Sequence, residues 1–217
     1  MSFHIYFDLD GTLTDSFEGI SKSILYAVDK LGHPRPSNEY LRYCIGPSLY
    51  DTFPEMVGEE LTLKAVNLYR ERFDKIGWCE NKPYEGIHEA LSSIADAGYT
   101  LFVATSKPRI NAERIIDHFE MRPYFERVFG SEFDGTHANK IDLLKYAIEE
   151  IPGTFDRAMV GDRKYDVMGA IANNMRPIGV SYGYGSIKEL INAGTDTIAS
   201  SPACIKEKVE SAFSINH

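Results

Sequence analysis

The 217-residue chain lacks several features that would assign it to a specialised class of protein. Its three cysteines (Cys44, Cys79 and Cys204) lie far apart and form neither a CxxC pair nor a zinc-type spacing. No apolar run approaches the roughly 18 residues of a membrane-spanning helix, and residues 1–10 contain no basic segment followed by an apolar one. We therefore expect a cytoplasmic protein without disulfides, signal peptide or membrane contact.

Positive charge is also scarce, with 23 Lys and Arg against 32 Asp and Glu and a net charge of −9. This balance argues against a nucleic acid polymer or an anionic membrane as the main partner. A Walker A string is absent and residues 183–188 do not complete a GxGxxG motif, which argues against nucleotide-cofactor binding of those kinds. Length and composition indicate one globular domain or one domain with a modest insertion, and they favour no particular oligomeric state.

Short β-branched and apolar runs alternate with amphipathic helical patterns over most of the chain. One expected helix buries Ile87, Ala90, Leu91 and Ile94, and a second buries Ile141, Leu144, Ile148 and Ile151. Strands that alternate with helices form a parallel sheet covered on both faces. The fold class is therefore α/β, with a Rossmann-like three-layer core. The expected strands are residues 3–8, 100–104, 127–129, 158–160, 177–180 and 197–199.

One stretch interrupts this alternation, because residues 15–84 contain helical patterns and no convincing strand. The segments 13–16 and 81–86 have the character of hinges, and Pro83 and Gly86 mark the second. We therefore predict a catalytic core of residues 1–14 and 86–217, with residues 15–85 inserted after the first strand as an α-helical cap.

The first strand ends in Asp8 and Asp10, which are followed by Gly11 and Thr12. Ligands of open parallel sheets bind beyond the carboxyl ends of the strands, so both carboxylates lie where a site is expected. Two acids this close repel each other, and a divalent cation with oxygen ligands relieves that repulsion. Gly11 permits a tight turn that presents backbone N–H groups to an anion. The alternative is an ordinary turn at the end of a strand.

Later strand ends carry further polar residues, each of which also has a simpler interpretation. Thr105 and Ser106 precede Pro108 and either cap the next helix or hold an anion there. Lys140 at a helix start opposes the helix dipole, so it is either a solvated lysine or the partner of a nearby anion. Asp162 and Asp166 share one helix face, which suits a metal and its surroundings but also an N-cap and an exposed acid.

Taken together, these motifs resemble those of the haloacid dehalogenase superfamily of phosphatases. Residues 7–16, Phe-Asp-Leu-Asp-Gly-Thr-Leu-Thr-Asp-Ser, are similar to its first motif. Thr105 matches its phosphate-binding Ser/Thr, Lys140 its basic third motif, and residues 160–166 its acidic fourth motif. The position of the helical insertion, with residues 45–49 and 83–86, is similar to the phosphoglycolate phosphatase-like branch.

This resemblance implies phosphoryl transfer in two steps. Asp8 attacks phosphorus and forms an aspartyl-phosphate, while Asp10 protonates the leaving group and later activates water. Mg²⁺ is held by Asp8, the backbone carbonyl of Asp10 and Asp162. Asp166 fixes Lys140 or a metal-bound water from outside this set. The residues expected to hold the phosphate or another anionic group of the substrate are Thr105, Lys140, Gly11, Thr12, Ser106 and Lys107.

The expected activity is a magnesium-dependent phosphatase that acts on a small phosphomonoester, with phosphoglycolate as the first candidate. A 5′-nucleotidase or a pyrophosphatase is the next alternative, followed by a phosphomutase of the same fold. A dehalogenase needs neither a metal nor a second aspartate, so Asp10 and Asp162 count against it. A non-catalytic binding module would be expected to have lost one of the acids or Lys140.

Overall fold

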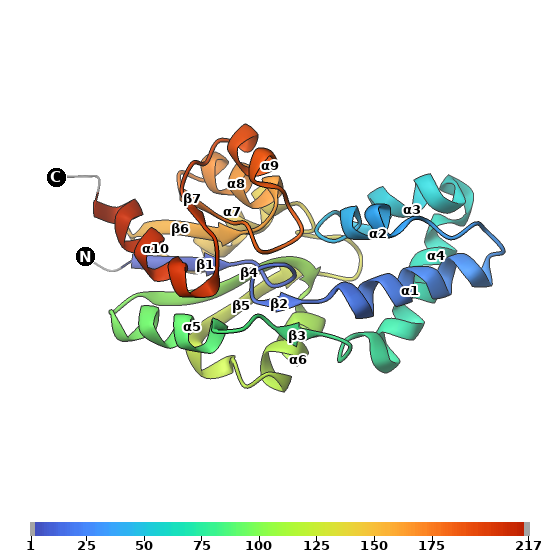
Figure 1. The fold of residues 1–217 in the computed structure, drawn as a ribbon, viewed down its shortest axis with the longest axis horizontal. Helices are drawn as coiled ribbons and strands as arrows, with labels where there is room; N and C mark the ends of the chain where they lie inside the picture. Colours follow the sequence, from blue (N-terminus) through green and yellow to red (C-terminus); the bar gives the residue numbers. More distant parts are fainter. Residues whose placement is uncertain (1–2, 215–217) are drawn as a thin grey trace. The chain divides into compact units, whose positions relative to one another are not determined.

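The computed structural model of the protein describes residues 3–214 and contains a six-stranded parallel sheet in the order β5-β4-β1-β6-β7-β8 (Figure 1). The chain leaves the central strand β1 toward β4 on one side and returns to β6 on the other. The carboxyl ends of these three neighbours therefore meet at one edge of the sheet, at the point where the strand order reverses. The strands are β1 (Phe3–Phe7), β4 (Thr100–Pro108), β5 (Phe125–Ser131), β6 (Asp156–Gly161), β7 (Arg176–Val180) and β8 (Ile198–Ala199).

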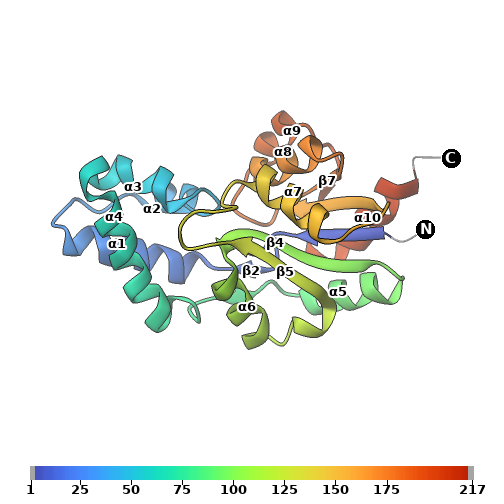
Figure 2. The same ribbon diagram turned by 180° about the vertical axis from the view of Figure 1, so that it is seen from behind.

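Helices cover both faces of this sheet, as the alternating pattern predicts (Figure 2). Helices α5 (Ile87–Asp96), α6 (Arg109–His118) and α10 (Ile205–Ser214) lie on one face. Helices α7 (Lys140–Glu150) and α8 (Lys164–Ala172) lie on the other, and α9 (Ile187–Ala193) packs against α8. Tyr6, Phe102 and Phe129 form the centre of the core beneath α7. In residues 3–214, no helix is both long enough and apolar enough to span a bilayer.

The six strands occur where the sequence predicts them, within a few residues, and the predicted helix faces differ from the structure at one position. The face expected for α5 is confirmed, since Ile87, Ala90, Leu91 and Ile94 are all buried. Of the four residues expected to face the core from α7, Leu144 is buried and Ile148 and Ile151 pack against the core, but Ile141 is exposed. Lys140, Leu143 and Ala147 are buried in addition, and the Lys140 ammonium meets carboxylates there.

Residues 15–82 form a second compact unit, and residues 1–14 with 83–217 form the first. The second unit thus ends at residue 82, three residues before the end predicted for the cap, residue 85. The chain passes between the units through β2 (Thr14–Asp15) and β3 (Lys82–Pro83), two short strands that pair with each other and that the sequence did not predict. The second unit contains α1 (Phe17–Lys30), α2 (Asn38–Tyr43), α3 (Leu49–Val57), α4 (Glu59–Arg72) and the π-helical turn η1 (Phe73–Gly77).

Within this second unit, the start of α1 lies directly against the end of η1. The Gly19 N–H donates a hydrogen bond to the Glu80 carbonyl over 2.9 Å. A Cβ atom at Gly19 would overlap the Gly77 carbonyl oxygen, so the contact depends on the missing side chain. The two ends of the inserted segment are therefore held together close to the points where the chain enters and leaves the unit.

This contact predicts that a glycine-to-alanine substitution in a helix destabilises the protein, whereas such substitutions ordinarily stabilise it. Alanine within a helix ordinarily stabilises by roughly 0.5–1 kcal/mol, but we expect Gly19→Ala to lower the free energy of unfolding by about 1–3 kcal/mol because of the overlap. Urea denaturation measures this, with the exposed neighbour Glu18→Ala as a control that changes stability by at most about 0.5 kcal/mol. An unchanged or increased stability of Gly19→Ala would contradict the packing described.

Candidate active site

The chemistry-bearing residues of the three central strands gather where these strands end. Asp8 follows β1, and its N–H donates to the Val160 carbonyl of β6 over 2.9 Å. Asp162 follows β6, and Thr105 lies in β4 on the other side of β1. All three side chains are buried. The edge at which the sheet topology predicts a ligand site therefore carries two buried carboxylates and a buried hydroxyl.

A buried lysine connects two of the acids. The Lys140 ammonium lies 3.0 Å from Asp8 Oδ1 and 2.8 Å from Asp166 Oδ1, and it donates to the Ala104 carbonyl over 2.8 Å. The other oxygen of Asp166, Oδ2, accepts the Arg163 N–H over 3.0 Å. Of the two interpretations that the sequence allows for Lys140, the structure shows the partner of nearby anions and not a solvated lysine.

Burial and mutual repulsion shift the protonation of these groups. Burial raises the pKa of Asp8 to about 6; Lys140 opposes this rise, while Asp166 and Asp10 add to it. Burial, together with Asp166 and Asp8, also raises the pKa of Asp162 well above its usual range. Burial lowers the pKa of Lys140, but the attraction of Asp166 and Asp8 outweighs it and the net shift is upward. The site therefore resists holding all its carboxylates ionised without additional positive charge.

The donor set fits a hard divalent cation. One carboxylate oxygen from each of Asp8, Asp162 and Asp166 lies within 4.8 Å of the other two. Asp162 Oδ1 is buried and has no hydrogen-bond partner within residues 3–214. When all are ionised, these three acids and the single Lys140 ammonium leave two negative charges, which one Mg²⁺ would neutralise. Oxygen-rich sites of this kind suit magnesium.

The turn after β1 provides space for these acids, but it does so differently from the expectation for Gly11. The Gly11 N–H donates to the Thr14 carbonyl over 2.8 Å and the Thr12 N–H to the Leu9 carbonyl over 3.3 Å, so both groups are used within the turn. Gly11 has a φ of 86°, and a Cβ atom there would overlap the Asp162 carboxylate. Gly11 therefore contributes a left-handed backbone conformation and room for the Asp162 carboxylate, while its N–H group is bonded to the Thr14 carbonyl and does not face an anion.

Residues 181–185, which follow β7, form a part of the site that sequence reasoning missed. The Tyr184 N–H donates to Asp162 Oδ2 over 2.7 Å, and the Tyr182 hydroxyl donates to the Thr12 carbonyl over 2.9 Å. A Cβ atom at Gly183 would overlap the Asp162 side chain, and one at Gly185 its carbonyl. The signal in the sequence is the Gly-Tyr-Gly string at residues 183–185, shortly after β7, which does not complete a dinucleotide-binding motif.

Thr105, Ser106 and Lys107 lie at the end of β4. The Thr105 hydroxyl accepts the Lys107 N–H over 3.2 Å, which leaves its own proton available for donation. The Ser106 carbonyl accepts the Ser131 hydroxyl over 2.8 Å. The Lys107 ammonium lies 2.8 Å from Asp10 Oδ2. Asp10 therefore pairs with a lysine of its own and lies outside the group formed by the other three acids.

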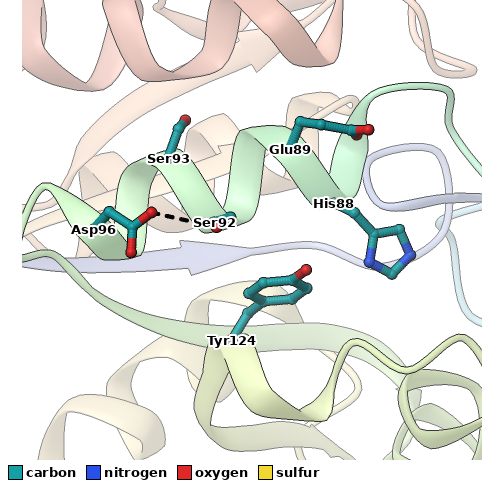
Figure 3. A pocket seen from close by; sticks show the side chains of 6 residues that line it. All are labelled: His88, Glu89, Ser92, Ser93, Asp96 and Tyr124. Atoms are coloured by element: carbon teal, nitrogen blue, oxygen red, sulfur yellow. Dashed lines mark hydrogen bonds between the residues drawn. The ribbon is translucent and has the colours of Figure 1, made fainter.

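A surface hollow elsewhere on the first unit is drawn in Figure 3. It is lined by five residues of α5 and by Tyr124 of the short helix η2 (Arg122–Tyr124), and within it the Ser92 hydroxyl bonds Asp96 Oδ2 over 3.4 Å. The ring centroids of His88 and Tyr124 lie 5.8 Å apart, and the rings meet edge to face at 64°. These elements do not carry the carboxylates described above, so the hollow is a different feature from the candidate site.

Known proteins with similar sequences are mostly phosphate-handling enzymes. The family model for haloacid dehalogenase-like hydrolase matches residues 5–180. A 5′-nucleotidase of Pseudomonas aeruginosa is 42% identical over 190 residues, with 86% of each chain covered. A phosphoglycolate phosphatase of Vibrio parahaemolyticus is 27% identical, with 94% of this chain and 95% of its own covered. A protein named tyrosine-protein kinase PtkA, from Mycobacterium tuberculosis, is 36% identical over 94% of this chain and 70% of its own.

Solved structures with the same fold include a protein described as a predicted phosphatase from Clostridium acetobutylicum. It superimposes with a TM-score of 0.91 at 41% identity, over 97% of this chain and 99% of its own. The structure of PtkA superimposes with a TM-score of 0.82 at 33% identity, over 99% of both chains. Both matches extend over nearly the whole chain, so they include the core and the inserted helical segment.

The raised pKa of Asp8 predicts how the stability of the metal-free protein depends on pH. Between the ordinary value of 3.8 and about 6, the folded protein holds a proton on Asp8 that the unfolded chain has lost. The contribution of Asp8 to the free energy of unfolding therefore falls as pH rises through this range, by up to roughly 3 kcal/mol. We expect this fall to be absent in Asp8→Asn.

Urea denaturation of both proteins in chelator, at intervals from pH 4 to pH 7, measures the effect. The difference between the wild-type protein and Asp8→Asn reports the contribution of Asp8 together with its coupling to Asp162, whose pKa Asp8 also raises. A difference that stays constant or changes in the opposite direction would contradict the raised pKa.

Proposed function

Because the chain belongs to the haloacid dehalogenase-like hydrolase family and is a hydrolase of phosphate esters, we propose that it is a magnesium-dependent phosphatase that forms an aspartyl-phosphate on Asp8. Its substrate is a small phosphorylated metabolite. The observation that carries the proposal is the buried contact of the Lys140 ammonium with both Asp8 and Asp166. This contact holds a carboxylate nucleophile in place at the expected ligand edge of the sheet.

In the first step, a carboxylate oxygen of Asp8 attacks phosphorus and the bond to the ester oxygen breaks. Lys140 keeps Asp8 ionised and oriented, which offsets the effect of burial on its pKa. Asp10 donates a proton to the leaving oxygen. The Thr105 hydroxyl, whose oxygen accepts the Lys107 N–H, donates a hydrogen bond to a phosphoryl oxygen and keeps its proton.

In the second step, water attacks the phosphorus of the aspartyl-phosphate. Asp10, now a carboxylate, takes a proton from this water, and Asp8 leaves as a carboxylate. Asp166 acts on the reaction through Lys140, because its Oδ1 contacts the ammonium and its Oδ2 is held by the Arg163 N–H. Asp166 therefore supports the nucleophile from outside the reacting atoms.

Asp8, Asp162 and the backbone carbonyl of Asp10 would hold Mg²⁺, and the bound cation would neutralise charge on the transferring phosphoryl group. The buried Asp162 Oδ1, which lacks a hydrogen-bond partner in the described part of the chain, supports this assignment. Tyr184 fixes the other oxygen of the same carboxylate. Asp162 is thus oriented by the protein and has one oxygen left for a ligand.

Among substrates, a nucleoside monophosphate now precedes phosphoglycolate. The relative named 5′-nucleotidase is 42% identical, against 27% for a relative named phosphoglycolate phosphatase, which reverses the order expected from the sequence motifs. A relative named putative pyrophosphatase, 32% identical over 82% of this chain, keeps pyrophosphate as a third candidate. We assign residues 15–82 as the cap that selects among them.

A second candidate function is phosphoryl transfer to a protein hydroxyl, which the 36% identity to PtkA supports. The same aspartyl-phosphate would then pass its phosphoryl group to tyrosine in place of water. Incubation with a labelled phosphate donor and a tyrosine-containing peptide separates the two functions, because hydrolysis releases inorganic phosphate and leaves the peptide unlabelled.

Removal of the nucleophile should abolish turnover. Asp8→Asn has nearly the same size but lacks the ionised oxygen, so we expect phosphate release to fall by at least about 10⁴-fold, since the covalent route is lost. Phosphate release is measured from nucleoside monophosphates, phosphoglycolate, sugar phosphates and pyrophosphate. A folded Asp8→Asn protein with near wild-type turnover would exclude Asp8 as the nucleophile.

Asp162→Asn should weaken magnesium binding, because it removes one of the charges that favour the cation. We expect the magnesium concentration at half-maximal activity to rise by roughly 10- to 100-fold, or activity to be lost. Calorimetric titration of magnesium into both proteins provides a readout without turnover. Identical magnesium titrations for the two proteins would contradict the assignment of Asp162 as a ligand.

A further inference from the structure

Lys107 forms a second buried ion pair beside the one made by Lys140. Its ammonium lies 2.8 Å from Asp10 Oδ2, and the two side chains are only 6% and 11% exposed. The sequence predicts that this lysine meets an anionic group of the substrate. In the structure its ammonium is instead paired with the Asp10 carboxylate of the protein itself.

The backbone of β4 brings Lys107 to this position. Thr105 pairs with Gly130 of β5, and the next paired residue is Pro108, opposite Ser131. Ser106 and Lys107 are therefore extra residues in β4, and such a bulge redirects the side chains it contains. Two hydrogen bonds fix the bulge, one from the Ser131 hydroxyl to the Ser106 carbonyl and one from the Lys107 N–H to the Thr105 hydroxyl.

The pairing leaves the two oxygens of Asp10 in different environments. Oδ2 is held by Lys107, while Oδ1 is buried and, among residues 3–214, has no hydrogen-bond partner. The two buried lysines also divide the acids between them, since Lys140 contacts Asp8 and Asp166. A carboxyl group fixed through one oxygen has the other available for exchange of a proton.

We propose that Lys107 is the positioning residue for Asp10, and that Oδ1 of Asp10 is the atom that exchanges the proton. This inference rests on the proposed function. Before the first step, Oδ1 of Asp10 takes up a proton from solvent while Oδ2 keeps its contact with Lys107; that proton then moves to the ester oxygen as its bond to phosphorus breaks, and Asp10 becomes a carboxylate again. The Lys107 ammonium stabilises that carboxylate. In the second step Oδ1 takes a proton from the attacking water, which restores the carboxyl group.

This role predicts an effect that depends on the leaving group. An alkyl ester such as a nucleoside 5′-monophosphate releases a strongly basic alkoxide and needs the proton from Asp10. p-Nitrophenyl phosphate releases a weakly basic phenolate and does not. Since kcat/KM reports only the steps through the first irreversible one, loss of Lys107 should lower it for the alkyl ester alone.

The test compares wild type with Lys107→Met, which keeps the apolar stem but removes the charge. We expect kcat/KM for the nucleoside monophosphate to fall by about 10- to 100-fold, a part of the 10²–10⁴-fold that general acid catalysis supplies. For p-nitrophenyl phosphate, kcat/KM should change by at most about threefold, whereas kcat should fall because activation of water still requires Asp10. Lys107→Arg should restore most of the loss.

Two further variants separate this role from a general disturbance of the site. In an Asp10→Asn background, Lys107→Met should cost at most about a further threefold, because the two residues act as one unit. Arg109→Gln, two positions along, removes an exposed cation that pairs with Glu113, and it should leave both substrates unaffected. If Lys107→Met does not fold, Lys107→Gln provides the same comparison.

An equal loss of kcat/KM on both substrates would overturn the proposal and assign Lys107 to the phosphoryl group. No loss on either substrate would also overturn it and leave a structural ion pair. A wild-type protein that hydrolyses neither ester would instead contradict the proposed function, and the inference about Lys107 with it. The failure of the inference alone thus differs from the failure of the proposed function.

Discussion

The structure of the site depends on the burial of like charges. Asp8, Asp162 and Asp166 lie together at the carboxyl ends of the central strands, with the Lys140 ammonium between two of them. Burial raises the pKa of Asp8 to about 6 and that of Asp162 well above its usual range. A nucleophile must be ionised, so the site needs positive charge beyond that of Lys140. This requirement favours a divalent cation, which would also hold the anionic phosphoryl group of a substrate.

Much of the surrounding chain serves to bring backbone close to these acids. The glycines at 11, 183 and 185 all lie against Asp162, where a side chain would overlap it. The N–H groups of Tyr184 and Arg163 bond to Asp162 and Asp166. The rigid parallel sheet fixes the strand ends, and the loops between strand and helix provide the hydrogen bonds that orient each carboxylate. Asp10 is oriented separately, through Lys107.

Local patterns were sufficient to predict the strands and the candidate acids, because period, turn residues and the Asp-x-Asp-Gly-Thr string are all local. Contacts between distant segments were not predictable in the same way. The burial of Lys140 follows from its long-range pairing with Asp8 and Asp166, which the apolar pattern of the helix does not record. The position of Lys107 beside Asp10 depends on the bulge in β4, and thus on the register with β5, which no local pattern contains. Tyr182 and Tyr184 gave no motif, since they act through a hydroxyl and a backbone N–H.

The most direct test of the central claim is chemical identification of the phosphorylated residue. Wild-type protein is mixed with substrate and magnesium, quenched in acid and reduced with borohydride, which converts an aspartyl-phosphate to homoserine. Peptide mass spectrometry then locates the change. We expect homoserine at position 8, only when substrate and magnesium are both present. Reduction at another residue, or at none despite active turnover, would contradict a mechanism through Asp8.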